Sequence, residues 1–126
     1  MSNASVVTRE DSLKERALQI LNLRYLLEPD IKGSYRRRIF EHHPDKHPEA
    51  EDNPAKLGEL QNRIKVINQS YGLLLDVLRG SRIDLRKYSL LEDTGLVESV
   101  LPQNVKPVPL GKTELELWKE KFEKSL

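Results

Sequence analysis

Apolar residues recur with the period of a helix near the start of the chain. Between Ser12 and Leu23 the positions that follow this period are Leu13, Ala17, Leu18, Ile20, Leu21 and Leu23. Ser12 and Glu15 also have the spacing of a capping box, in which each side chain binds the other residue's backbone N–H at the start of a helix. The pattern predicts a first helix over residues 12–23.

A second helix is predicted from Pro29 to about Glu41. Proline suits the first helical position because its missing N–H would have no helical partner there. The apolar residues recur every four positions and form one narrow stripe, at Ile31, Tyr35 and Ile39. Pro44 ends this helix, because proline cannot donate a helical hydrogen bond and disfavours helical geometry in the residue before it.

The longest helix is predicted after a polar loop at 45–52. Asn53 and Pro54 form a start signal, as N-cap and first helical residue, and Gly80 is a stop signal. Between them the apolar residues follow in steps of three and four: Leu57, Leu60, Ile64, Ile67, Tyr71, Leu74 and Leu78. This stripe is longer than one partner helix can cover. We therefore expect an all-α fold in which the second and third helices form an antiparallel hairpin, the first helix packs across it, and the loop at 43–45 lies at its tip.

The pattern changes after Gly80. Short helices are predicted at 84–91 and 95–101, and the prolines between 102 and 109 predict an extended connector. A second capping box opens a terminal helix at Thr113, and the apolar residues of this helix share one face: Leu115, Trp118, Phe122 and Leu126. Because that face would otherwise expose a large apolar area, we expect the terminal helix to dock on the outer side of the first or third helix, away from His43.

The length of 126 residues allows one small domain and an appendage. Residues 1–11 are expected to be disordered, and Ser2-Asn3-Ala4 within them resembles a remnant of an expression vector. Residues 12–80 form the predicted helical domain. Residues 81–126 form a C-terminal extension that contains the connector and ends in the amphipathic helix.

Composition excludes several classes of protein. The absence of cysteine rules out disulfides, thiolate zinc sites and cysteine nucleophiles. The 21 Lys+Arg residues nearly cancel the 20 Asp+Glu residues, and a net charge of +1 argues against a protein that coats nucleic acid. No apolar run approaches the roughly 20 residues of a membrane span, and the first residues lack the pattern of a secretory signal. We therefore expect a cytoplasmic protein with no membrane partner.

Two motifs lie at a characteristic distance from each other. The basic second helix ends in His43-Pro44-Asp45, and the third helix carries Ile67-Asn68-Gln69-Ser70-Tyr71. Over about residues 17–78 the sequence resembles the J-domain of the DnaJ (heat-shock protein 40) co-chaperone family, whose hallmark is His-Pro-Asp between a basic helix and a long helix carrying Ile-Asn-x-x-Tyr. The tripeptide alone is a weak indicator, whereas its combination with the second motif is specific.

The resemblance implies a function without chemistry of its own. J-domains bind DnaK-type (heat-shock protein 70) chaperones in their ATP state and accelerate the chaperone's ATP hydrolysis. The residues that would engage the chaperone directly are His43, Pro44 and Asp45. Those that match helix positions facing its acidic surface, or positions beside that face, are Lys32, Tyr35, Arg36, Arg37, Lys46 and Lys65. We expect no catalytic residue, no cofactor and no metal, and the sequence leaves the oligomeric state open.

The sequence departs from the family pattern at three positions. Arg38, His42 and Ile64 stand where the family usually has Leu, Tyr and Phe. These residues weaken the inference about packing near the hairpin tip, although Arg38 could lay its stem along the core with its head in water. The Gly-Phe-rich stretch and the four-cysteine zinc module of general DnaJ proteins are absent. A J-domain-only or specialised member is therefore favoured.

The same residues are compatible with other functions. His42, His43 and His47 with Asp45 have the chemistry of a metal cluster, but such residues on a polar loop are more often solvated. The run at 36–38 could contact phosphate, yet it lacks interleaved aromatic residues and a basic domain around it, which argues against nucleic acid. The competing hypothesis is a helical adaptor that uses a J-like scaffold to bind nucleic acid or another protein. An adaptor has no physical requirement for an intact His-Pro-Asp.

Overall fold

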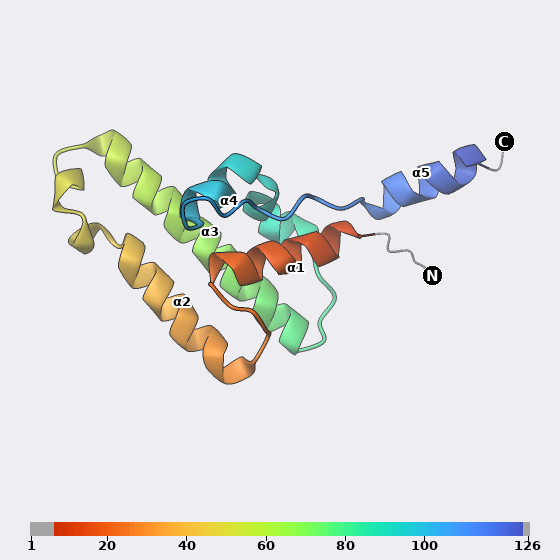
Figure 1. The fold of residues 1–126 in the computed structure, drawn as a ribbon, viewed down its shortest axis with the longest axis horizontal. Coiled ribbons are helices and arrows are strands. Elements are labelled where there is room, and N and C mark those ends of the chain that lie inside the picture. The colour runs from red at the N-terminus through yellow and green to blue at the C-terminus, as the bar shows by residue number, and fades with distance from the viewer. Residues whose placement is uncertain (1–6, 125–126) are drawn as a thin grey trace.

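The computed structural model describes residues 7–124 and confirms the all-α prediction (Figure 1). Its α-helices are α1 (Arg9–Ile20), α2 (Glu28–His42), α3 (Pro54–Leu78), α4 (Thr94–Val100) and α5 (Glu114–Lys124). Three 3₁₀ segments connect them: η1 (Pro44–Lys46), η2 (Pro48–Ala50) and η3 (Leu85–Glu92). In the described residues β-type pairing is limited to one parallel bridge, between Thr8 and Lys112. No helix within 7–124 has the length and apolar character needed to cross a membrane.

Helices α2 and α3 lie side by side in opposite directions, and η1 and η2 connect them at one end (Figure 1). Helix α1 packs against α3. The apolar faces of the three helices meet in one core, whose fully buried members include Leu13, Ala17, Ile31, Ile67 and Leu74. This core fixes the orientation of α2, and the chain leaves α2 directly into the loop.

Helix α3 buries a second face that the predicted stripe did not include. Val66, Ser70 and Leu73 are fully buried at helical spacing beside the predicted face. Segments η3 and α4 pack against α3 and contribute to the same core Tyr88, Leu91, Val97 and Val100. Residues of the predicted C-terminal extension therefore share one core with the predicted helical domain.

The predicted start of the first helix is wrong by three residues. Helix α1 begins at Arg9 because Thr8 is its N-cap, with the Thr8 side chain accepting a hydrogen bond from the Asp11 N–H. Ser12 is buried instead, and its hydroxyl donates to the Arg9 carbonyl and accepts from the Gly111 N–H. Residues 9–11, within the segment expected to be disordered, thus belong to α1, and Thr8 precedes them as its cap. Residues 1–6, with Ser2-Asn3-Ala4, lie outside the described residues.

The predicted bounds of the third helix are confirmed. Asn53 caps α3 by accepting a hydrogen bond from the Lys56 N–H, and Pro54 is the first helical residue. The helix ends at Leu78, and Gly80 follows with φ of +69°, a conformation that residues with a Cβ rarely adopt.

The connector at 102–112 is bound along α1. The Arg16 Nε donates to the Val108 carbonyl at 2.7 Å, and the Gln19 amide bonds both the Lys106 carbonyl and the Val108 N–H, each at 3.0 Å. Helix α5 then extends away from the other helices (Figure 1). Its apolar side chains remain 60, 58 and 52% exposed at Leu115, Trp118 and Phe122. The predicted docking of the terminal helix is therefore wrong for the described residues, and Leu126 lies outside them.

Candidate functional site

The turn at 43–45 is built by the proline that ends α2. His43 adopts an extended conformation, with φ of −70° and ψ of 138°, because the following proline disfavours the helical region. Its Nδ1 accepts a hydrogen bond from the Asp45 N–H at 3.1 Å. A neutral ring that accepts at Nδ1 carries its proton on Nε2. The turn therefore offers an imidazole donor and a carboxylate, on side chains that are 50% exposed for His43 and 90% exposed for Asp45.

Short-range hydrogen bonds hold this turn in place. The Lys46 N–H donates to the His43 carbonyl, and the His47 N–H donates to the Pro44 carbonyl, each at 2.9 Å. The His47 ring joins the end of α2 to the loop, because its Nε2 donates to the Glu41 carbonyl at 2.8 Å and its Nδ1 lies 3.1 Å from the Glu49 carboxylate. The pKa of Glu49 is lowered by a hydrogen bond from its own backbone N–H and by His47. The loop is ordered by its own polar contacts and keeps its surface free.

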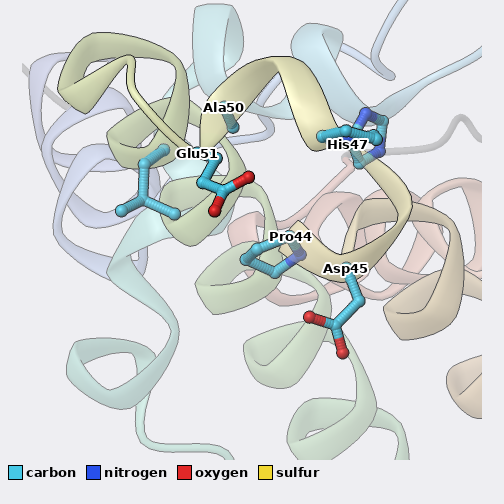
Figure 2. Close-up of a pocket in the computed structure, with 7 residues that line it drawn as sticks. Pro44, Asp45, His47, Ala50 and Glu51 are labelled. Atoms are coloured by element: carbon cyan, nitrogen blue, oxygen red, sulfur yellow. The ribbon is translucent and has the colours of Figure 1, made fainter.

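A hollow of about 390 Å³ lies beside the turn. Its lining combines apolar and acidic side chains with one histidine: Pro44, Asp45, His47, Pro48, Ala50, Glu51 and Leu57. Figure 2 shows the Pro44 ring between the carboxyl groups of Asp45 and Glu51, with the His47 ring across the loop from Glu51. This surface suits a partner group that is apolar in its body and cationic at its tip.

The predicted cationic residues occupy exposed positions on α2, on α3 and in the loop. Lys32, Arg36 and Arg37 are exposed on α2, Lys65 is exposed on α3, and Lys46 lies within η1. In the described part of the chain none of the five forms an ion pair, so their charges are open to a partner in solution. Lys46 Nζ lies 4.1 Å from the centre of the Phe40 ring. Phe40 is 58% exposed beside the loop, and the sequence prediction missed it because it falls outside the stripe of α2.

Tyr35 differs from the other predicted site residues because it packs between α2 and α3. Its ring stacks on Tyr71, with the ring centres 4.1 Å apart, and its hydroxyl donates to the Asn68 side chain at 2.6 Å. Tyr35 is half-buried as a result. Its position explains why Asn68 and Tyr71 accompany the basic helix in the sequence, since all three residues fix the separation of the two helices.

The structure does not bring the three histidines and Asp45 to one point. His42 turns inward, and both of its ring nitrogens are buried without a hydrogen-bond partner. Burial, followed by the charges of Arg38 and Arg63, lowers the pKa of His42 to about 4. Within residues 7–124 no group of three His, Cys, Asp or Glu side chains is arranged to hold a metal ion.

Two arginines hold the C-terminal extension through contacts that the sequence did not predict. The Arg16 guanidinium is buried and donates to the Val108 and Leu91 carbonyls and to the Thr94 hydroxyl, at 2.7, 2.9 and 3.0 Å. The sequence signal for the burial of Arg16 was its position between Leu13 and Ala17 on the apolar face of α1. The head of Arg38 does not lie in water as suggested, because it bonds backbone carbonyls and its side chain is only 13% exposed.

Comparison with protein-family models, with curated proteins and with solved structures gives no match to this chain. The functional assignment therefore rests on the turn, the cations around it and the helices that position them.

Proposed function

We propose that this chain is a J-domain-type co-chaperone that binds a DnaK-type chaperone in its ATP state and stimulates the chaperone's ATP hydrolysis. The observation that carries the proposal is the exposed turn formed by His43, Pro44 and Asp45, presented between α2 and α3. The J-domain resemblance supplies the identity of the partner. The chain itself contributes contacts and no catalytic group.

The geometry of the turn supports a docking role. A turn already held by its own hydrogen bonds loses little conformational entropy when a partner binds it. The Asp45 carboxylate accepts hydrogen bonds or faces a cation, and the His43 Nε2–H donates. The partner surface that fits these groups has a cation and an acceptor a few ångströms apart.

The exposed cations on α2 and α3 support the same function at longer range. Lys32, Arg36, Arg37 and Lys65 are exposed and form no ion pair with the described residues. Such charge attracts an acidic surface before contact and raises the association rate, and salt screens this attraction. Cations would steer the encounter, and the turn would fix the bound orientation.

The proposal is tested by single-turnover ATP hydrolysis with a DnaK-type chaperone, in the presence and absence of this chain. The parent chain should accelerate hydrolysis. His43→Gln and Asp45→Asn should each abolish the acceleration, with an unchanged helical circular-dichroism spectrum and nearly the same melting temperature, because an exposed turn adds little to stability.

Asp52→Asn is the matched control, since it removes an exposed carboxylate that follows the same loop. This variant should stimulate like the parent. Full stimulation by His43→Gln or Asp45→Asn would refute the assignment of the turn. No stimulation by the parent chain would favour the helical adaptor.

A further inference from the structure

One side chain of α2 joins the C-terminal ends of two other helices. The Arg38 Nε donates to the carbonyl of Ile20, the last residue of α1, at 2.8 Å. The Nη2 of the same guanidinium donates to the carbonyl of Val100, the last residue of α4, and its Nη1 pairs with Glu41. Arg38 therefore connects α2 with both α1 and the extension.

These carbonyls need a partner that their own helices do not provide. The last carbonyls of a helix have no N–H within the helix to bind them, and they carry the negative end of the helix dipole. Neither α1 nor α4 has a basic residue in its last turn. The charge and donors of Arg38 satisfy both helix ends from a third helix.

The position of Arg38 along α2 gives this contact its significance. It lies five residues before His43, about 7.5 Å along a helix that rises 1.5 Å per residue. Within the described residues, Tyr35 makes the other side-chain hydrogen bond from α2 to another helix, and Tyr35 lies farther from the loop than Arg38. The end of α2 that bears the turn is thus held to the rest of the molecule through Arg38.

We propose that Arg38 is a positioning residue, through which α4 and the extension hold the loop end of α2 so that the turn at 43–45 is presented in a fixed orientation. This inference rests on the proposed function. It makes the folded part of the extension a component of the chaperone-binding unit. The packing of α4 against α3 fixes the position of Val100, and the hydrogen bond from Arg38 to Val100 fixes α2 relative to it.

Arg38→Met tests the inference, because methionine keeps much of the apolar stem and removes all the hydrogen bonds. We expect the half-maximal concentration for stimulation to rise about fivefold or more, the usual size of coupling between linked sites. Arg38→Lys should restore part of the loss, because an ammonium keeps the charge and donates to these carbonyls.

Gln19→Met is the matched control. Gln19 bonds the connector at Lys106 and Val108 from a partly exposed position on α1, and neither bond involves α4 or the turn. This variant should stimulate with the parent's half-maximal concentration.

Amide hydrogen exchange gives a readout that needs no chaperone. Arg38→Met should speed exchange selectively at residues 39–46, and Gln19→Met should not. Equal losses of stimulation in the two methionine variants, following their melting temperatures, would overturn the inference, as would normal stimulation by Arg38→Met. If the parent does not stimulate, the proposed function fails, and amide exchange alone then tests the positioning role. An equal increase in exchange rate along the whole of α2 in Arg38→Met would refute that role as well.

Discussion

Replacing His42 by Phe should stabilise the fold and make its stability less sensitive to acid. The His42 ring lies inside the loop end of α2 with both nitrogens buried and unpartnered. Burial and the charges of Arg38 and Arg63 lower its pKa to about 4. Phenylalanine places an aromatic ring in the same position without polar atoms and without a titrating group.

The expected size follows from two effects. At neutral pH a buried polar group without a partner costs about 1–3 kcal/mol, and fitting the larger phenyl ring offsets part of this gain, which leaves about 1 kcal/mol of stabilisation. Below neutral pH the unfolded chain binds a proton at His42 near pH 6.5, whereas the folded chain binds it only near pH 4. The folded state therefore holds fewer protons in this window, and the free energy of unfolding falls as the pH falls from 6.5 to 4.

Each unit of pKa difference corresponds to about 1.4 kcal/mol. The interval between the pKa values of 6.5 and about 4 sets an upper bound of about 3 kcal/mol for the free energy of unfolding that the parent loses in acid. Solvent screens part of it because the ring is only half-buried, so about 1–2 kcal/mol is expected. The parent should lose this amount relative to His42→Phe.

Urea unfolding followed by circular dichroism, at about pH 7 and about pH 4.5, measures the difference. Comparing parent with variant at each pH cancels the titration of shared carboxylates and histidines. His42→Gln is the control, because it keeps a polar side chain and removes the titrating group. Its free energy of unfolding should fall as little between pH 7 and pH 4.5 as that of His42→Phe, but it should not show the gain of His42→Phe at pH 7. An equal gap between parent and His42→Phe at both pH values would refute the reasoning.

Three further predictions concern the surface of the molecule. Deleting residues 114–126 should leave the melting temperature within about 2 °C of the parent, and the single tryptophan of the full chain should show red, quencher-accessible fluorescence; a clear drop or a blue emission would indicate docking. Gly111→Ala should lower the melting temperature by several degrees, because a Cβ would lie 2.4 Å from two backbone carbonyl oxygens, whereas Gly58→Ala, with nothing within 4 Å, should not. Arg36→Ala with Arg37→Ala should weaken chaperone binding at low salt and less at high salt; a loss independent of salt would indicate a close, desolvated contact.

Local rules of backbone chemistry predicted the frame of the loop correctly. Pro44 ends α2 and places the preceding His43 in an extended conformation. Asn53 caps α3 and is the last residue before that helix begins. Each of these effects acts within a few residues, so the sequence carries it in full. The functional role of the turn, in contrast, came from the J-domain resemblance and stays a prediction.

Long-range polar contacts were not predictable from the sequence pattern. Periodicity treats an arginine as a surface residue, yet Arg16 is buried because the Leu91 and Val108 carbonyls lie 75 and 92 positions away along the chain and meet it in space. The same reasoning applies to Arg38 and Val100. The second buried face of α3 was missed because its partners, η3 and α4, are short helices with weak patterns of their own.

The failed docking of α5 has a physical reason in the connector. Docking assumed that 102–112 is a free tether, but hydrogen bonds with Arg16, Gln19 and Ser12 bind it along α1, and the Thr8–Lys112 bridge fixes its end at the start of that helix. Burying the Trp118 and Phe122 rings on the core would gain a few kcal/mol, and breaking these polar contacts would offset the gain. Helix α5 therefore leaves the body at the end of the molecule opposite the loop (Figure 1). A partner that covers its apolar face would not compete with a chaperone for the turn at 43–45, because the two surfaces are separated by the length of the helical core.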